Sequence, residues 1–216
     1  MMLGARTAAW AKSETIPAIW IGIDTSYFDS EIPFGDGHVI VDIQFYRKTT
    51  PSAGQYVFGG FKNGRFDACV YTSSFWFVGY GSNSSNCLFS EGGELVYNKI
   101  NRTIYDIDYN LRTISFSANG HDFLKNVGFS FSNSDFSPYI GARRQGSSSV
   151  SEPSHDVGII SVDITKNGSP FRKYRPRVQN GVVGLFDEVN NVFHEPIFGG
   201  NNLTFITDIT KDGVIV

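Results

Sequence analysis

The chain has 216 residues and a net charge of −3, and it is rich in aromatic residues and glycine, with 19 Phe, 10 Tyr and 23 Gly. Lys and Arg are scattered, apart from the pair Arg143-Arg144 and the run from Arg172 to Arg177. The chain therefore has no basic field for a phosphate backbone, and we expect no nucleic-acid partner. No apolar stretch approaches the roughly 20 residues that cross a bilayer, so we expect a soluble protein without membrane insertion.

The first 16 residues are rich in alanine and lack the alternation of a strand. We expect them to form an arm outside a single folded domain that comprises residues 17–216. A tryptophan, a lysine and a glutamate interrupt the apolar character of the arm, so no secretory signal peptide is expected. Leu3, Arg6 and Trp10 are candidates for docking the arm in the groove of a partner.

Alternation of apolar and polar residues begins near Ile19 and continues along the chain. Val39, Val41, Ile43 and Phe45 alternate with polar residues, the pattern of a strand with one buried face. The same period returns in residues 66–70, 113–117, 127–132 and 160–164. In the last of these, the apolar face is expected to comprise Ile160, Val162 and Ile164. Since no window shows a helical stripe, the sequence predicts an all-β fold of two packed antiparallel sheets.

Turn dipeptides separate the strands. Asn-Gly occurs at residues 63–64, 119–120, 167–168 and 180–181, and Asp-Gly at 36–37 and 212–213. Asn-Gly favours the two positive φ angles of a type I′ hairpin turn. Around residues 63–64 the hairpin would place Phe61 opposite Phe66. Residues 104–109 and 112–118 are expected to form a hairpin that turns at Asn110-Leu111 and continues as a meander.

Two segments rich in glycine and serine, residues 79–93 and 143–155, are expected to be loops at the rim of the sandwich. Glycan binding needs an aromatic face and polar partners for sugar hydroxyls. The candidate glycan-binding residues are Trp76, Tyr80, Asn83, Asn86, Arg143 and Arg144. The alternative is that residues 75–78 form an ordinary buried strand and that the loop after them is only solvated.

Catalytic patterns are weak in this sequence. A Glu-x-Asp-x-Glu strand is absent, and its nearest counterpart, Asp106-Ile107-Asp108, is expected to face solvent. No Gly-x-Ser-x-Gly elbow is present. The four histidines lack metal-ligand spacing, and surface loop positions are expected for His38, His121, His155 and His194. We therefore expect a protein that is not an enzyme and uses no cofactor or metal.

The two cysteines, Cys69 and Cys87, lie 18 positions apart and could be bridged or free. Nothing else in the sequence marks an oxidising compartment, so free thiols are expected.

The C-terminal third carries a recognisable pattern. It consists of Asp-Ile-Thr-Lys-Asn-Gly at residues 163–168, a segment ending near Pro176, and Gly-Val-Val-Gly-Leu-Phe-Asp at residues 181–187. This pattern resembles the closing strands of laminin-G-like or concanavalin A-like jelly rolls of tailed-phage virion proteins and gut-bacterial surface proteins. Residues 23–32 are similar to the family's opening strand but lack its glycine after Asp29-Ser30.

The resemblance covers roughly residues 17–207, and its matching residues have structural explanations. Two segments, residues 57–60 and 139–142, occupy the places of the family's mid-sheet strands. We expect Asp187 to cap the turn that follows it. Gly184 and Gly141 are expected to allow close backbone approach inside a strand.

The resemblance implies a phage virion-associated protein, either a capsid decoration, a head fibre or a tail attachment protein. Its arm would bind other virion proteins, and many copies or a homo-oligomer would display a lectin-like jelly roll to host glycan. The alternative is a glycan-binding module on a bacterial cell surface, and a sandwich glycoside hydrolase is disfavoured by the missing carboxylate pair. Some members hold Ca²⁺ at the rim; Asp24, Asp29 or Asp135 could serve, but they supply too few oxygens.

Overall fold

The computed structural model of the chain is all β, with no helix among the residues that it describes. The described residues are 15–21, 26–32, 35–47, 55–62, 65–72, 76–79, 87–89, 96–128, 137–145, 149–151, 157–197 and 203–210. The arm residues Leu3, Arg6 and Trp10 lie outside these ranges, so their docking role stays a prediction. Within the same ranges, no helix of the length and hydrophobicity needed to cross a bilayer is found.

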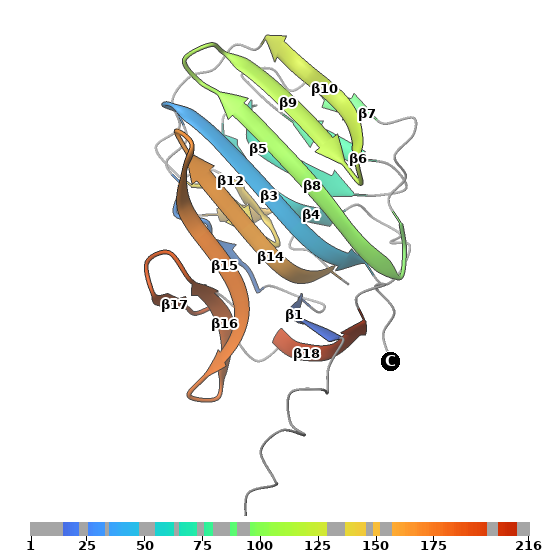
Figure 1. Ribbon diagram of the computed structural model, residues 1–216, viewed down its shortest axis with the longest axis vertical. Coiled ribbons are helices and arrows are strands. Elements are labelled where there is room, and N and C mark those ends of the chain that lie inside the picture. The colour runs from blue at the N-terminus through green and yellow to red at the C-terminus, as the bar shows by residue number, and fades with distance from the viewer. Residues whose placement is uncertain are drawn as a thin grey trace, which may run out of the picture.

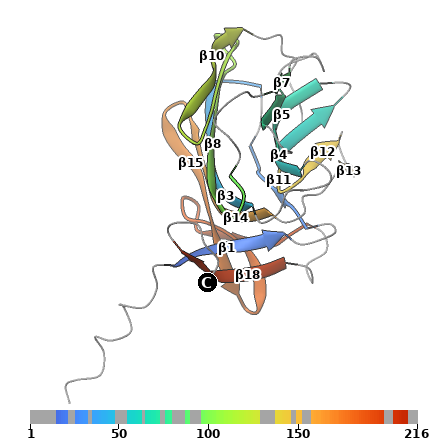
Figure 2. The ribbon, with the colours of Figure 1, turned by 90° about the vertical axis from the view of Figure 1, so that its right-hand side faces the viewer.

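Two sheets pack face to face, as the side view in Figure 2 shows. The larger sheet, which faces the viewer in Figure 1, has the order β10 (His121–Gly128), β9 (Thr113–Ala118), β8 (Lys99–Asp108), β3 (His38–Arg47), β14 (Val157–Lys166), β15 (Ser169–Gln179), β16 (Val182–Asp187) and β17 (Val192–His194), and β1 (Thr15–Ile21) joins it between β14 and β18 (Leu203–Thr210). The smaller sheet has the order β13 (Ser149–Ser151), β12 (Arg143–Gln145), β4 (Gln55–Lys62), β5 (Arg65–Thr72), β6 (Trp76–Gly79) and β7 (Cys87–Phe89), with β11 (Tyr139–Ile140) between β4 and β2 (Phe28–Asp29). Every described strand pair is antiparallel except β12 with β4. The predicted two-sheet sandwich is confirmed.

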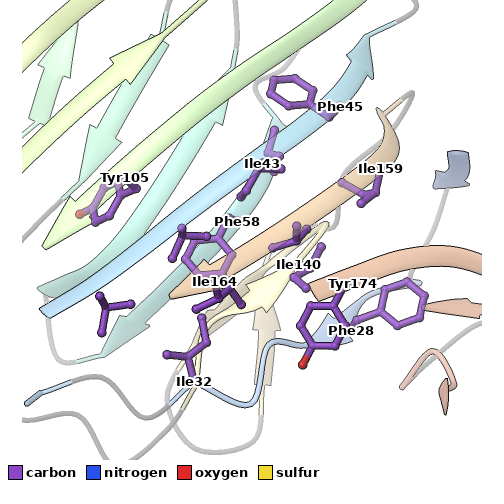
Figure 3. Close-up of a cluster of buried hydrophobic side chains, with 14 of the residues drawn as sticks. Phe28, Ile32, Ile43, Phe45, Phe58, Tyr105, Ile140, Ile159, Ile164 and Tyr174 are labelled. Atoms are coloured by element: carbon purple, nitrogen blue, oxygen red, sulfur yellow. The ribbon is translucent and has the colours of Figure 1, made fainter. Parts of the chain in front are cut away.

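The core lies between the two sheets. In β3 the side chains of Val39, Val41, Ile43 and Phe45 are buried, and the residues between them are half-buried on the opposite face. They belong to one cluster with Phe58 of β4, and Figure 3 shows how residues of both sheets contribute to it. The alternation read from residues 39–45 and 113–117 is therefore confirmed.

The alternation predicted for residues 160–164 is confirmed, since Ile160, Val162 and Ile164 are buried and the two residues between them are half-buried, but β14 also contains a bulge. Ile159 pairs with Phe45 and Ser161 pairs with Gln44, so Ile160 is the extra residue of a bulge. Ile159 and Val162 both belong to the core cluster, so these residues on either side of the bulge face the same way although three positions separate them. A bulge shifts the face of every residue on one side of it, which alternation alone does not reveal.

The larger sheet forks at β14. Residues 157–159 of β14 pair with β1, whereas residues 162–166 pair with β15. Beyond Tyr174, β16 is the only described strand that pairs with β15, and β15, β16 and β17 extend away from the rest of the sheet at the lower left of Figure 1. Pro176, where the segment was expected to end, lies inside β15 opposite Leu185. Its missing N–H is tolerated because β15 has an unpaired side there.

The Asn-Gly turns have the predicted backbone. Asn119, Asn167 and Asn180 have φ angles of 49°, 51° and 53°, and each following glycine also has a positive φ. Cross-strand pairing of Phe61 with Phe66 confirms the hairpin around residues 63–64, although that turn itself lies outside the described residues. Local turn chemistry thus determines these hairpins.

Gly141 has a different role from the one expected. It lies between β11 and β12 rather than inside a strand, and its φ is 78°. The chain reverses here, since β11 is antiparallel to β4 and β12 is parallel to it. Glycine is suited to this position because a positive φ is strained for other residues.

The first strand, β1, begins at Thr15, two residues before the expected end of the arm. Thr15 and Ile16 belong to β1 and pair with Thr210 and Ile209 of β18. Both are β-branched and fit an extended strand, so the sheet includes the last two residues of the expected arm.

The strand register bears on the two cysteines. Cys69 of β5 and Cys87 of β7 are both opposite Gly79 of β6. Two strand spacings place their Cα atoms about 9.5 Å apart, which exceeds the roughly 7 Å limit of a disulfide. We expect alkylation in denaturant without reductant to label two thiols per chain. Labelling that requires reductant would contradict this register.

Candidate functional site

Two of the predicted glycan-binding residues, Trp76 and Arg144, lie far apart in the smaller sheet. Arg144 of β12 is opposite Gly60, which pairs with Ala68 of β5, whereas Trp76 of β6 is opposite Thr72. Three strand spacings and four residues along β5 separate Arg144 from Trp76, so their Cα atoms are on the order of 19 Å apart. This separation between the two backbone positions is longer than one monosaccharide.

The remaining members of that set are only partly placed. Arg143 pairs with Ser151 of β13 at the edge of the smaller sheet. Tyr80, Asn83 and Asn86 lie outside the described residues. Glycan contact through these residues therefore stays a prediction.

Asp106 and Asp108, the nearest counterparts of a carboxylate pair, each have a different partner. Nε2 of His38 lies 2.6 Å from Oδ1 of Asp106. Oδ1 of Asp108 accepts hydrogen bonds from the N–H groups of Asn110 and Leu111, at 2.9 and 2.8 Å. Asp108 thus stabilises the turn between β8 and β9.

The described histidines lie in strands rather than loops, contrary to expectation. His38 and His121 begin β3 and β10, and His194 ends β17 with its side chain only 15% exposed. Its ring stands edge-on to Tyr174, with centroids 5.2 Å apart. His155 lies outside the described residues.

Of the candidate calcium ligands, only Asp29 is described. Its Oδ1 accepts hydrogen bonds from the Ser137 hydroxyl and from the N–H of Glu31. Asp24 and Asp135 lie outside the described residues. In the part of the chain that the structure describes, no three His, Cys, Asp or Glu side chains converge as a metal site would require.

A cluster of polar side chains lies on the inner face of β15, β16 and β17. The guanidinium of Arg172 is 3.3 Å from Oε2 of Glu31 and 3.5 Å from Oδ2 of Asp187. Nδ1 of His194 is 3.5 Å from the other oxygen of Glu31. The cluster connects the three strands to the loop after β2.

Tyr174 completes this connection. Its hydroxyl donates a 3.0 Å hydrogen bond to the carbonyl oxygen of Ser30. Burial raises the pKa of Tyr174, even though the nearby charge of Arg172 lowers it. The phenol therefore stays protonated at neutral pH and acts as a donor rather than a base.

Asp187 is the fully buried member of the inner cluster. One oxygen accepts hydrogen bonds from the N–H groups of Lys173 and Val189, both at 3.0 Å. The other accepts a 2.6 Å hydrogen bond from the Asn190 amide. The predicted cap on the turn after Asp187 is thus confirmed, and the same carboxylate also bonds β15.

Asp187 should make the stability of the fold depend on pH. Burial raises the pKa of this carboxyl, but hydrogen bonds, chiefly from Asn190, and the charge of Arg172 outweigh burial, so the pKa lies below the ordinary 3.8. A lowered pKa stabilises the fold above about pH 4, and the contribution is lost as pH falls toward the folded-state value. We expect urea midpoints to fall more steeply from pH 5 to about pH 3 in the wild type than in Asp187→Asn. Parallel curves would contradict this expectation.

The outer face of the same strands carries a different set of side chains, here named the β15–β17 platform: Arg175, Arg177, Phe186, Glu188 and Phe193. Arg175 is opposite Phe186, which is opposite Phe193, so all three point away from the core. The guanidinium of Arg177 stacks 3.6 Å from the centroid of the Phe186 ring. Both phenylalanines are half-buried, whereas Arg177 and Glu188 are exposed.

Gly184 allows the platform to form. A Cβ placed there would overlap the carbonyl oxygen of His194 and the ring of Phe193. Close backbone approach, as predicted for this glycine, is confirmed. The ring of Phe193 therefore lies over Gly184, directly beside the position of Arg177.

Sequence reasoning did not identify this platform. The run from Arg172 to Arg177 was noted only as a concentration of charge. In a strand its residues alternate, so Arg172 and Tyr174 face inward while Arg175 and Arg177 face outward. The available signal was this period of two, combined with the aromatic residues at 186 and 193.

Comparisons with known proteins show similarity of fold. No protein-family model matches the chain, and no curated protein matches it in sequence. A solved structure from Bacteroides ovatus, described as a candidate carbohydrate-binding protein, has a TM-score of 0.59 and 14% identity, covering 89% of this chain and 60% of that one. A heptameric SAP-like pentraxin from Limulus polyphemus has a TM-score of 0.52 and 13% identity, covering 70% of this chain and 76% of that one. A sialidase from Trypanosoma rangeli has a TM-score of 0.46 and 13% identity, covering 62% and 21%.

The similarities to the Bacteroides and Limulus structures define the class of fold. A concanavalin A-like β-sandwich fits the two sheets and the structures that resemble them. The chain spans only 60% of the length of the Bacteroides structure.

Proposed function

We propose that this chain is a non-enzymatic, lectin-like module that binds glycan through the β15–β17 platform. The observation that carries the proposal is the combination of two half-buried aromatic rings, Phe186 and Phe193, with Arg177 and Glu188 on one outward face. Aromatic rings pack against the C–H face of a sugar, and charged groups bind its hydroxyls. The candidate carbohydrate-binding protein of similar fold supports this proposal.

The test is a glycan array probed with the full chain, followed by affinity measurement for any ligand found. Phe193→Ala should weaken binding about two- to tenfold, because it removes a stacking ring. Leu111→Ala is the matched control, since Leu111 is 73% exposed in the distant β8–β9 turn. An array without ligands, or equal affinity for Phe193→Ala and wild type, would refute the proposal.

The non-enzymatic part rests on the roles of the acidic side chains. Asp106 is held by His38, and Asp108 caps a turn. Neither carboxylate is thus arranged with the other as an acid and a nucleophile across a cleft. We expect no products from a panel of polysaccharides incubated with the protein, and any product that disappears in Asp106→Asn would reverse this part of the proposal.

We also propose that the module is displayed in many copies on a phage virion. The support is the composition of the arm, with Leu3, Arg6 and Trp10 suited to a partner's groove. Multiple copies would convert weak single-site binding, about −4 kcal/mol at millimolar affinity, into firm adhesion. Bacterial cell-surface display is the alternative.

Deleting residues 1–14 separates the two locations, because this deletion stops before β1 and spares the sheet. Loss of the protein from purified particles, with an unchanged melting temperature, is the expected result. Unchanged incorporation of the shortened chain would count against arm docking, and recovery of the protein on bacterial cells instead of particles would favour the alternative.

A further inference from the structure

Among the described residues, Arg177 has no carboxylate partner of the kind that two other arginines on the same face have. On the same face of the sheet, Arg175 forms two hydrogen bonds with Asp163, and Arg102 forms two with Asp42. For Arg177, no ion pair is found with any residue in the described ranges. Its positive charge is therefore left for a ligand.

The guanidinium of Arg177 is also held in place. It lies 3.6 Å from the centroid of the Phe186 ring, and β15 and β16 fix the two backbones in register. A guanidinium stacked through its face keeps its N–H groups in its own plane, where a planar acceptor can reach two of them. Because stacking already restricts this side chain, binding costs less conformational entropy.

An apolar surface lies beside this charge. Gly184 is the cross-strand partner of Arg177 and has no side chain, and the Phe193 ring lies over it. A ligand that contacts both must combine a C–H face with a negative group next to it. The single charge of Arg177, which has no ion-pair partner in the described ranges, matches the single charge of a carboxylate better than a phosphate dianion.

We infer that the β15–β17 platform takes a carboxylate-bearing sugar, a hexuronic acid residue of an acidic polysaccharide, with the carboxylate on Arg177 and the ring on Phe193. The inference rests on the proposed glycan binding and specifies its ligand class. Glu188 is 52% exposed, and its Oε2 lies 3.9 Å from Nε of Arg175. Its exposed carboxylate accepts hydrogen bonds from sugar hydroxyls.

The experiment is calorimetric titration of the full chain with oligosaccharides of galacturonic, glucuronic or mannuronic acid, each compared with its methyl ester. The ester keeps the sugar and the linkage but removes the charge. At least one acid should bind about tenfold or more tightly than its ester, because a charge-assisted pair is lost. Arg177→Gln should abolish this preference and Arg177→Lys should weaken it, since lysine lacks the planar fork.

Arg102→Gln is the control, because it removes the same charge from the same face of the sheet at a guanidinium already paired with Asp42. It should retain the preference. Equal affinity for acid and ester, an unchanged preference in Arg177→Gln, or binding of neutral glycans alone overturns the inference and leaves the proposed function standing. Absence of binding to acids, esters and every array glycan overturns both.

Discussion

Asp187→Ala is expected to lower the free energy of unfolding by about 3–5 kcal/mol, because it removes the buried acceptor of an ion-pair and hydrogen-bond network. The N–H groups of Lys173 and Val189 and the amide of Asn190 would lose their shared partner. These donors belong to β15 and to the turn before β17, so the whole extension should loosen. Urea denaturation followed by tryptophan fluorescence measures the change.

Glu188→Ala is the matched control for this substitution. Its carboxylate is adjacent in sequence but 52% exposed, and a surface ion pair contributes at most about 1 kcal/mol. Asp187→Asn keeps one acceptor oxygen and should give an intermediate loss. If Asp187→Ala and Glu188→Ala had equal effects, Asp187 would not be the centre of this network.

Gly184→Ala is expected to destabilise the fold by about 1–3 kcal/mol and to displace β17, because the added methyl group overlaps existing atoms. One of these atoms is the backbone oxygen of His194, which cannot rotate away, and the others belong to the ring of Phe193. Relief requires β17 to move away from β16. Hydrogen exchange should therefore accelerate in residues 185–187 and 192–194 more than elsewhere in the larger sheet.

Gly128→Ala provides the comparison for Gly184→Ala. Gly128 lies at the end of β10, it is exposed, and an added Cβ there meets nothing within 4 Å. Its substitution should change stability by less than about 0.5 kcal/mol. Unaltered exchange in residues 192–194 of Gly184→Ala would show that β17 tolerates the extra methyl group.

The two substitutions act on one part of the molecule from opposite faces. Asp187 fixes the inner face of β15–β17, and Gly184 lets the outer platform form around Phe193. We expect both variants to weaken any glycan binding through altered geometry, without removing a platform side chain.

Local features of the sequence predicted a large part of the fold. Alternation placed Val39, Val41 and Ile43 in the core, and Asn-Gly dipeptides placed the turns at 119–120, 167–168 and 180–181. The cap formed by Asp187 was also predictable. In each case the cause lies within a few residues of chain, either the two-residue period of a strand or the φ angles that a turn requires.

The candidate site was less predictable than the strands. Trp76 was expected beside one polar loop and Arg144 within another, but Arg144 lies in β12, and the strand order separates it from Trp76 by β4 and β5. His194 was expected in a surface loop, yet it is held by Glu31, which is 163 positions earlier in the chain. Such pairings depend on which strands become neighbours, and the local sequence of a strand does not show which strand will lie beside it.

By itself, the sequence determined the class of fold, the positions of most strands and the turns between them, because side-chain period and backbone φ preference are properties of short segments. Only the tertiary structure decided the fork at β14, the bulge at Ile160 and the assembly of Arg177, Phe186 and Phe193 on one face. The reason is that the register between strands arises from contacts across the whole core, where residues distant in sequence pack against one another.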